Sequence, residues 1–551
     1  MAALVVGPLL RYVDERQATV WVETDRRCEV EVLGKRQQTF AVEGHHYALV
    51  TVEGLEPASS HPYEVALDGR TVWPPPAADQ PPSVIRTQAD GAADAAPTLV
   101  TFGSCRTVLG GQESDDPDRI DALRAFARRA AGAPDERLPD LLVLLGDQVY
   151  DENGAPRTRE FIRSRRGVDQ PPGECPADFE EYTRLYREAW QDADVQWLLS
   201  TVPSAMIFDD HDIIDNWNTS EAWVAWARAQ PWWSQRATGG LMAYWLYQHV
   251  GNLSPQARDA DPVWSRIPAH PDAGPLLRGW AAGQDAGTNG TPGAQWSFLR
   301  DVGPIRVLMV DSRNGRVLHG GRRDMLDDDE WAWLEGRAAD LDGVDHLLIG
   351  TSLPFLLPRG IHDHEAWVTA VCDGRWGRLA ARLAERLRQE LQFNHWVTFP
   401  ASFIRLAALL RGVAAGERGA APATVGVLSG DVHYSYLALL TPEGDAPTSP
   451  VWQAVSSPLC YDLERAIVGG FGALMSRPAR WLGQSLARLA GVRDAGARWD
   501  LVDGPWFRNV ISTARFDGPQ ARVTLEQTVV GPADAQLRVV ANRSLNTVQT
   551  P

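Results

Sequence analysis

The sequence predicts a small all-β domain followed by an α/β domain whose core is two sheets flanked by helices. Three observations support this fold class. Short β-rich segments with period-two alternation fill the first part of the chain. From about residue 98, apolar strand-like runs alternate with helical patterns, which is typical of an α/β domain. After Val451 the pattern returns to strands such as VWQAVSS and ARVTLEQTVV, which would add the second sheet.

The composition describes a folded protein and excludes some classes of partner. The 551 residues are enough for two or more domains, and 44% of them are hydrophobic and 23% charged. A formal net charge of −18 repels nucleic acid and anionic lipid, so we expect no nucleic-acid-binding module. No apolar run is long enough to predict a transmembrane segment.

The cysteines favour a reducing compartment. The five cysteines are scattered, odd in number and contain no CxxC pair. The first ten residues, MAALVVGPLL, lack the basic segment of a secretion signal. We therefore expect a cytoplasmic protein, although a secreted mature form without its signal would look the same.

The chain divides into three parts. Residues 1–88 are predicted as an immunoglobulin- or fibronectin-like β-sandwich of about seven short strands. Its His45-His46 pair is expected to be a surface turn. Residues 89–97, rich in Ala and Asp, are predicted as a linker, and residues 98–551 as the larger α/β domain.

The stretch LLVLLGDQVYDE, residues 141–152, suggests where the chemistry lies. Its five leading apolar residues predict a strand buried on both faces. Asp147 follows the strand and Tyr150 lies in the loop, at the strand end where ligands collect in open α/β sheets. A carboxylate and a phenol there suit a metal ion, although Asp147 alone would also serve as a helix cap.

Three further strands end in metal-ligand chemistry. Their ends read GSC, FDDHDIIDNW and SGDVHYS, and they supply Cys105, Asp209, Asp210, His211, Asp212, Asp215, Asn216, Asp431 and His433. Carboxylates gathered in one crevice are unfavourable unless cations neutralise them, so we predict a metal centre. The alternative is four unrelated caps or turns. Thiol, phenol and imidazole ligands suit a transition metal such as iron, whereas all-oxygen ligands suit calcium, magnesium or manganese.

In this order, the motifs SC, GDxxY, DDHDxxDNW and SGDVHYS resemble those of the PhoD-type alkaline phosphatases in the calcineurin-like metallophosphoesterase superfamily. The resemblance implies a four-layer αββα catalytic sandwich preceded by a β-sandwich. It also implies Fe3+ bound by Cys105, Tyr150 and His433, with Asp147 bridging to a second ion. The second ion would be Ca2+, or Mn2+ or Zn2+ as elsewhere in the superfamily, held by Asp209, Asn216 and Asp431.

The resemblance further implies hydrolysis of a small phosphate mono- or diester by a hydroxide that the two metals activate. His211 is expected to orient the phosphate or protonate the leaving group, or else to fix Asp209. Arg106, where many relatives carry glutamine, is expected to clamp phosphate. The alternatives are a hydrolase of a non-phosphate ester and a non-catalytic, metal-stabilised binding protein.

Other basic and aromatic residues have two interpretations each. His362 and His364 are expected either to line the substrate entrance or to be loop features. Arg313 and Arg316 are expected to bind phosphate or to form surface salt bridges. A run of tryptophans after the third motif would pack helices onto the sheet or form a substrate wall; its members are Trp217, Trp223, Trp226, Trp232 and Trp233.

Two stretches, residues 401–413 and 466–492, combine Leu, Phe and Trp with Arg and contain almost no acid. Such stretches can lie on a membrane surface. Because the protein as a whole is acidic, we expect instead that they form helices covering the domain or the site.

Overall fold

The computed structural model describes residues 1–91, 96–108, 119–133, 136–152, 155–287, 295–442, 449–463, 465–492, 497–531 and 535–546. The predicted linker, residues 89–97, therefore lies partly outside the described residues. The last strand of the N-terminal domain ends at Arg86, and the first strand of the following domain begins at Thr98.

The N-terminal domain is all-β, as predicted. Its main sheets have the strand orders β1-β2-β6-β5 and β4-β3-β8-β9, and β10 pairs with β7. The alternating sequence ATVWVET turns Val20 and Val22 into the core between the sheets, where both are fully buried. The strands are β1 (Leu4–Val13), β2 (Gln17–Thr24), β3 (Glu29–Val32), β4 (Lys35–Gln38), β5 (Phe40–Val42), β6 (His45–Glu53), β7 (Ser60–Pro62), β8 (Val65–Leu67), β9 (Arg70–Trp73) and β10 (Val84–Arg86).

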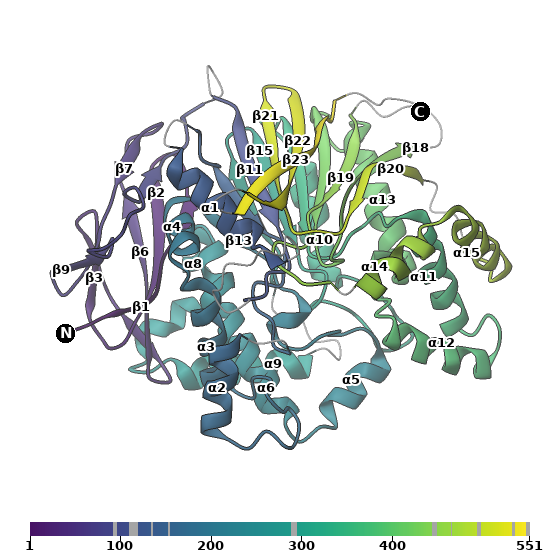
Figure 1. The fold of residues 1–551 in the computed structure, drawn as a ribbon, viewed down its shortest axis with the longest axis horizontal. Helices are drawn as coiled ribbons and strands as arrows, with labels where there is room; N and C mark the ends of the chain where they lie inside the picture. The colour runs from purple at the N-terminus through teal and green to yellow at the C-terminus, as the bar shows by residue number, and fades with distance from the viewer. Residues whose placement is uncertain are drawn as a thin grey trace.

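This domain packs directly against the helices of the rest of the chain, at the purple end of Figure 1. Arg11 is fully buried and donates to the backbone oxygen of Tyr247 at 2.7 Å. The prediction that His45 lies in a surface turn is wrong. His45 is the first residue of β6, and its ring lies between the carboxylates of Glu23 (2.8 Å) and Glu180 (2.7 Å). It therefore forms an ion pair that connects the two domains.

The second domain is built on two sheets packed face to face. The first has the order β13-β12-β11-β21-β22-β23 and the second β14-β15-β16-β17-β19-β18-β20. The first sheet contains β11 (Thr98–Gly103), β12 (Leu141–Leu144), β13 (Ser204–Met206), β21 (Val510–Asp517), β22 (Gln520–Val530) and β23 (Ala535–Ser544). The second contains β14 (Phe298–Val302), β15 (Ile305–Val310), β16 (His346–Thr351), β17 (Thr424–Ser429), β18 (Ser435–Pro442), β19 (Val451–Val455) and β20 (Ala497–Trp506).

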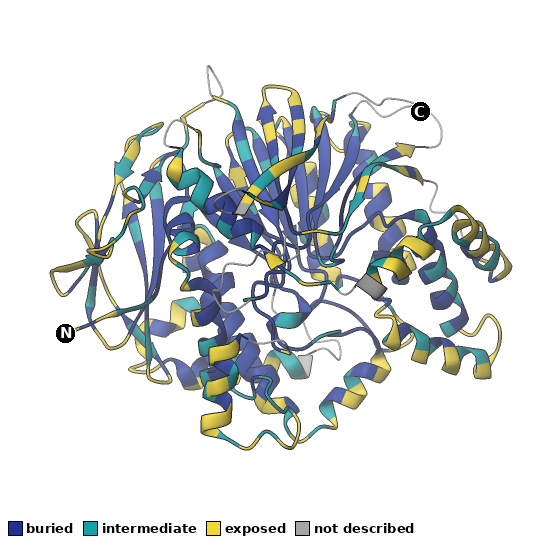
Figure 2. Ribbon diagram, in the orientation of Figure 1, coloured by how far each residue is buried: buried dark blue, intermediate teal, exposed yellow. Residues whose placement is uncertain are grey.

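Continuous apolar runs explain the burial of these strands on both faces. In β12 all four residues are buried: Leu141 and Val143 pack between the sheets, and Leu142 and Leu144 pack outward against helices. Helices α1 (Ala122–Gly132) and α4 (Ala193–Thr201) cover the first sheet, and α10 (Asp328–Ala339) and α13 (Pro400–Ala414) cover the second. The predicted four-layer αββα sandwich is therefore confirmed, and Figure 2 shows its strands as the buried centre.

Strands β11, β12 and β13 are parallel, and so are β15, β16, β17 and β19. Their carboxyl ends meet at one edge of the sandwich, where the predicted ligand loops lie. Further helices gather beneath this edge (Figure 1): α2 (Pro156–Arg165), α3 (Phe179–Trp190), α5 (Glu221–Arg228), α6 (Trp233–Tyr244) and α9 (Gly274–Gly287). Two short helices, α7 (Val250–Asn252) and α8 (Pro255–Asp259), contact the N-terminal domain instead.

The tryptophans after the third motif pack mainly against one another. The rings of Trp217 and Trp233 stack at 5.4 Å, and Trp223 meets Trp233 edge to face at 5.6 Å. All three are buried, whereas Trp226 is 51% exposed. The packing interpretation therefore accounts for most of this cluster.

Four helices form a lobe at the far end of the molecule from the N-terminal domain (Figure 1): α11 (Arg359–Cys372), α12 (Arg378–Glu390), α14 (Arg465–Leu474) and α15 (Arg477–Leu489). Both α12 and α15 pack on α11. Within the described parts of the chain, no helix is both long and apolar enough to cross a membrane.

Candidate metal centre

Four strand ends from both sheets bring their acidic, thiol and imidazole groups into one crevice. Cys105 follows β11, Asp147 follows β12, Asp209 follows β13 and Asp431 follows β17. Potential ligand atoms come within 4.8 Å of one another in three overlapping groups, which are Cys105/Asp147/His433, Asp147/Asp210/His211 and Asp147/Asp209/Asp210/Asp431. Asp147 belongs to all three groups, which is the position of a carboxylate shared between two ions.

The backbone at these strand ends turns in an unusual way. Five of the seven predicted metal ligands have a positive φ, a region that residues other than glycine rarely adopt. They are Cys105 (58°), Asp147 (53°), Asn216 (64°), Asp431 (64°) and His433 (57°). Such conformations concentrate at functional sites, because the surrounding structure must hold them. Four of these five residues lie in turns next to a strand, and Asn216 lies further along the loop after β13.

Glycine allows the turns to approach one another closely. Gly146 has a φ of 102°, and a Cβ atom at this position would collide with the Asp209 carboxylate. The Gly-Asp pair therefore does more than end the strand, because it lets the loop after β12 touch the loop after β13.

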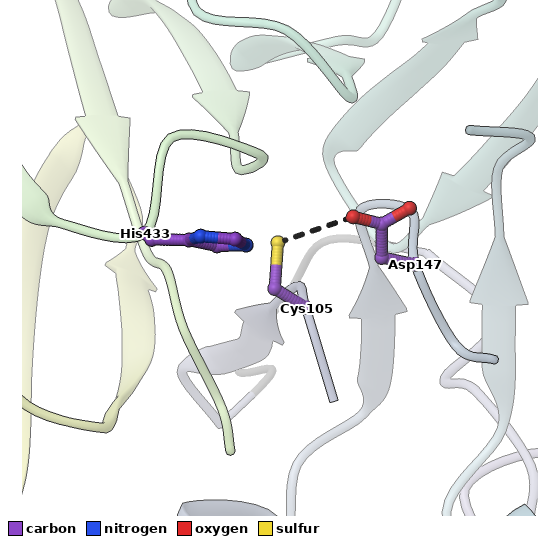
Figure 3. Close-up of side chains that lie close together, drawn as sticks. All are labelled: Cys105, Asp147 and His433. Carbon is purple, nitrogen blue, oxygen red and sulfur yellow. Dashed lines mark hydrogen bonds between the residues drawn. The ribbon is translucent and has the colours of Figure 1, made fainter. Parts of the chain in front are cut away.

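The first group of ligands, which we call the thiol cluster, contains Cys105, Asp147, Tyr150 and His433. Figure 3 shows the Cys105 sulfur between the Asp147 carboxylate and the His433 ring, with Sγ 3.5 Å from Asp147 Oδ2. The Tyr150 hydroxyl donates to Asp147 Oδ2 at 3.2 Å and lies 3.1 Å from His433 Nε2. These four predicted ligands therefore converge.

The electrostatics of the thiol cluster require a cation for its anionic forms. Burial, together with Asp147 and Asp431, raises the pKa of the Cys105 thiol well above its usual range. Burial and Asp147 do the same to the pKa of Tyr150. Burial lowers the pKa of His433 to about 3, which leaves its imidazole neutral and able to ligate. A bound metal ion is the means by which such a thiol becomes a thiolate.

Residues that sequence analysis did not select hold this cluster in place. The Ser457 hydroxyl donates to Cys105 Sγ at 3.3 Å and accepts the His433 backbone N–H at 3.1 Å. The Ser104 hydroxyl accepts the Asp431 backbone N–H at 3.1 Å. The Tyr461 ring stacks on His433 at 3.9 Å. Ser457 and Tyr461 lie in a segment without a motif, so only the tertiary structure identifies them.

The second group, which we call the acidic cluster, contains Asp147, Asp209, Asp210 and Asp431. Arg313 lies against three of these carboxylates. Its Nε donates to Asp209 Oδ1 at 2.6 Å, and its Nη2 lies 2.8 Å from Asp431 Oδ1 and 3.1 Å from Asp210 Oδ2. The Arg313 side chain is only 1% exposed, so the expectation of a surface salt bridge is wrong.

Arg316 has a different role. Its guanidinium is buried and donates to the backbone oxygens of Ser312 (2.9 Å) and Asn394 (2.9 Å). It therefore ties together the loops beside the site rather than forming a salt bridge at the surface.

Two carboxylate oxygens in the acidic cluster remain without a partner. Asp147 Oδ1 and Asp209 Oδ2 are buried, and neither has a hydrogen bond within the described structure. Burial and neighbouring carboxylates raise the pKa of both groups. Buried polar atoms are nearly always satisfied, so two orphaned oxygens in one crevice fit a site for cations.

Asn216 borders the acidic cluster through its backbone. Its N–H donates to Asp210 Oδ2 at 2.9 Å, while its side chain donates to Asp215 at 2.8 Å and accepts from Asn394 at 3.3 Å. The family resemblance implied a ligand role for Asn216 and none for Asp210, although both belong to the same acidic motif. The structure places the Asp210 carboxylate among the candidate ligand atoms.

His211 lies beside both clusters and is held in position. Its Nδ1 is 2.9 Å from Asp151 Oδ1, and its ring packs 4.2 Å from Tyr150. Asp151 is in turn paired with Arg236. Burial disfavours the charged imidazole, but Asp147, Asp151 and Asp210 outweigh it and raise the pKa of His211 well above its usual range. A cationic His211 can donate to a phosphate or a leaving group.

His395 is a further candidate, which no sequence motif indicates. Its Nδ1 lies 2.8 Å from Glu365 Oε1, and its Nε2 lies 3.7 Å from Asp431 Oδ2. This Nε2 is buried and makes no hydrogen bond to any described residue. No motif surrounds His395, so only its position beside the acidic cluster reveals it.

Three predicted substrate contacts lie elsewhere. The guanidinium of Arg106 pairs with Asp121 at 2.8 Å and donates to Ala189 O, which gives it a structural environment. His362 is buried between Phe403 and Trp499, and burial lowers its pKa. His364 Nδ1 lies 2.6 Å from Gly360 O, and its ring lies against Gly483 of α15. The structure thus corrects the expectation that these side chains face the substrate, because each is held by other partners.

Part of the chain matches a known family, and its fold resembles a solved structure. Residues 121–274 match the family model of the PhoD-like phosphatases, and residues 1–85 match a domain of unknown function (DUF7800). The solved structure of PhoD aligns with a TM-score of 0.59 and 13% identity, covering 99% of this chain and 93% of that chain. Purple acid phosphatase PPD1 from yellow lupin (Lupinus luteus) seeds aligns with a TM-score of 0.48 and 8% identity, covering 97% and 73%.

No curated protein matches the sequence of this chain. The matched stretch, residues 121–274, nevertheless includes Asp147, Tyr150, Asp209 and Asn216. The likeness to PhoD extends over nearly the whole chain and confirms the predicted fold. The family match and the candidate metal clusters together support metal-dependent hydrolysis of phosphate esters.

Proposed function

We propose that this protein is a phosphatase or phosphodiesterase that hydrolyses small phosphate esters with two metal ions bound in the crevice. The observation that carries the proposal is the position of Asp147, which belongs to both the thiol cluster and the acidic cluster and keeps one buried oxygen without a hydrogen bond in the described structure. Sharing one carboxylate is how two-metal phosphoryl-transfer sites bring their ions together.

The two clusters suit different ions. Cys105, Tyr150 and His433 with Asp147 would hold Fe3+, because thiolate, phenolate and imidazole are transition-metal ligands. Asp209 and Asp431, with Asp210 and Asn216 beside them, would hold Ca2+, or else Mn2+ or Zn2+. When bound, the ions would supply Lewis-acid activation of water and would neutralise charge on the phosphate oxygens.

The residues of the chain itself would position the substrate and a proton. Asp151 fixes the His211 ring at 2.9 Å, and the remaining His211 nitrogen can donate to a phosphate oxygen or to the departing alkoxide. Arg313 keeps three carboxylates in place, and its Nη1 is buried with no hydrogen bond to the described residues. This free donor supports the earlier expectation that Arg313 contacts phosphate.

The cytoplasm remains the proposed compartment. All five cysteines are free, in agreement with the reducing environment that the sequence favours. Non-phosphate ester hydrolysis and a purely metal-stabilised binding role remain the alternatives that the experiment must separate.

Purified protein should contain metal and should hydrolyse p-nitrophenyl phosphate, bis(p-nitrophenyl) phosphate, or both. Asp147→Asn should lower metal content and reduce hydrolysis at least about a hundredfold, because the shared charge is lost. Asp342→Asn, at an exposed position, is the matched control and should match the unmodified protein.

Preference for p-nitrophenyl acetate over both phosphate esters would support the non-phosphate alternative. Full metal occupancy with no hydrolysis of any of the three esters would support the binding protein. A well-folded protein that takes up no metal would contradict the whole centre.

A further inference from the structure

The helical lobe exposes large apolar side chains in an unusual concentration. Within the described part of the chain, eight of them lie in residues 376–391 and 467–489, which belong to α12, α14, α15 and their ends. They are Trp376 (44% exposed), Leu379 (77%), Leu383 (66%), Leu391 (52%), Ile467 (45%), Trp481 (70%), Leu482 (48%) and Leu489 (75%). Other strongly exposed apolar residues, such as Leu33 and Val539, lie on different elements. Exposed apolar side chains gathered in one lobe, with charged residues around them, mark interaction sites.

The exposed side chains follow helical spacing. Leu379 and Leu383 are one turn apart on α12, and Trp481 and Leu489 are two turns apart on α15. The two helices approach one another at their ends, where the Arg375 side chain lies near Gly491. Figure 2 shows exposed positions along both helices at the outer end of the molecule. We call these eight residues and the arginines beside them the apolar–basic face.

The charge of this face is opposite to that of the whole protein. Residues 375–391 contain five arginines and two glutamates, and residues 467–489 contain three arginines and no acid, whereas the chain carries −18. Arginines 375, 378, 382, 386, 477 and 488 are exposed. The acidic average that argued against membrane contact therefore does not apply at this surface.

The two apolar–basic stretches identified in the sequence turn out to differ. Residues 401–413 lie in α13, which buries Phe403, Leu406 and Leu410 against the second sheet. This part confirms the expectation of a helix that covers the domain. Residues 466–492 turn Trp481 and Leu489 outward instead, and no described element covers them.

Three binding partners are conceivable for the apolar–basic face, and its charge and apolar side chains together favour one of them. A second copy in a symmetric dimer would bring the same arginines together, which is unfavourable. Nucleic acid would use the arginines, but exposed leucines gain nothing from a phosphate backbone. An anionic bilayer uses both features, because leucine and tryptophan enter the interface while arginines meet lipid phosphates.

We propose that the apolar–basic face docks this protein onto anionic lipid bilayers. Trp376 and Trp481 lie at the headgroup level, and the flanking arginines contact lipid phosphates. This inference goes beyond the proposed hydrolysis and does not depend on it. The face is nevertheless connected to the site, because α11 carries Glu365, the partner of His395, and α14 begins four residues after Tyr461, which stacks on His433.

Flotation of the full-length protein with vesicles tests the proposal. We expect binding to phosphatidylcholine vesicles that contain phosphatidylglycerol, weak binding to phosphatidylcholine alone, and release at high salt. The double variant R378Q/R382Q should lower the partition coefficient about 25-fold, at roughly fivefold for each arginine. W481S/L489S should lower it at least about tenfold through lost apolar contact.

Val539→Ser, at a position that is 52% exposed on β23, is the matched control and should bind vesicles like the unmodified protein. All variants should keep the same melting temperature and the same hydrolysis of a soluble ester, which separates this proposal from the proposed function. No flotation with anionic vesicles, or equal flotation of W481S/L489S, would overturn it. A solution dimer that W481S/L489S dissociates would assign the face to a second copy instead.

Discussion

Arg313 donates a hydrogen bond from Nε to Asp209 Oδ1 at 2.6 Å, and both side chains are almost completely buried. The same guanidinium reaches Asp431 and Asp210, so one fixed cation offsets three carboxylates inside the crevice. Metal ions bound at Asp209 and Asp431 would help Arg313 to neutralise the negative charge of these carboxylates. We therefore expect Arg313 to hold these carboxylates in place in addition to any contact with phosphate, and we expect the stability of the protein to depend on bound metal.

The first prediction concerns Arg313→Met. Leaving buried carboxylates without their cation should destabilise the metal-free protein by about 3–5 kcal/mol. Added Ca2+ or Mn2+ should recover more stability in this variant than in the unmodified protein, because the ions replace the missing charge. Thermal unfolding with and without chelator measures both effects, and Arg313→Lys should give an intermediate result.

Arg322→Met is the control for this experiment, because Arg322 forms only surface pairs with Asp324 and Asp328. We expect it to change stability by less than about 1 kcal/mol, with no dependence on metal. Equal behaviour of the Arg313 and Arg322 variants would rule out the positioning role.

The second prediction concerns the visible absorption spectrum of the iron-loaded protein. If Cys105 and Tyr150 bind iron, the purified protein should absorb visible light through thiolate or phenolate charge transfer. Tyr150→Phe should shift or weaken the band while iron stays bound, and Cys105→Ser should lower the iron content. Tyr461→Phe, which keeps the ring that packs on His433 and Tyr150 and removes only the hydroxyl, serves as the comparison and should leave the band in place. An iron-loaded protein whose spectrum is unchanged in both ligand variants would contradict the thiol cluster as the iron site.

The third prediction separates the histidine that the structure identifies from one that the sequence suggested. His395→Gln should lower hydrolysis about 10–100-fold, because its Nε2 faces the acidic cluster. Glu365→Gln should show a smaller loss of the same kind, since it orients His395. His364→Gln should stay within about twofold, because the His364 ring lies against α15. Steady-state kinetics with one ester measure all three, and a larger loss in His364→Gln than in His395→Gln would reverse the assignment.

The fourth prediction concerns pH and the contact between domains. Burial disfavours charged His45, but Glu180 and Glu23 outweigh it and raise its pKa from 6.5 to about 9. Burial opposes ionisation of Glu180, but His45 and Arg184 lower its pKa from 4.5 to about 2. The stabilisation from His45 is complete below pH 6.5 and is lost as the pH rises through about 9. The stabilisation from Glu180 is complete above pH 4.5 and is lost as the pH falls toward 2.

The contact should therefore be strongest between pH 4.5 and 6.5. His45→Gln should remove stabilisation on the order of 2 kcal/mol in this window and little above pH 9. Thermal unfolding across this pH range measures the difference from the unmodified protein. The exposed His270→Gln is the control. A stability difference that does not change between pH 6.5 and 9 would exclude the charged contact.

Local sequence determined much of the fold and the thiol cluster. Runs such as LLVLL favour strands buried on both faces, and the Gly-Asp turn after that strand leaves Asp147 at its carboxyl end. The carboxyl ends of parallel strands lie at one edge of a sheet, so four strands followed by candidate metal ligands predicted a single crevice. Cys105, Asp147, Tyr150 and His433 do meet there. The periodicity is local, so it can be recognised without knowing any distant contact.

Only the tertiary structure decided which charges face that crevice. Arg106 follows Cys105 directly but points to Asp121, whereas Arg313, 207 residues after Arg106, points into the acidic cluster. His362 and His364 lie on a helix whose neighbours hold them, while His395 reaches Asp431. A side chain's direction depends on what packs around it, and those partners are far away in sequence.

The same reason separates the two apolar–basic stretches. Residues 401–413 and 466–492 have similar composition, and nothing in either stretch states which of them a sheet will cover. The sheet covers Phe403 and leaves Trp481 exposed. The sequence by itself determined that both form amphipathic helices, and the packing of the whole chain decided which one keeps its apolar side chains in contact with solvent, because burial is a property of the assembled layers and not of the segment.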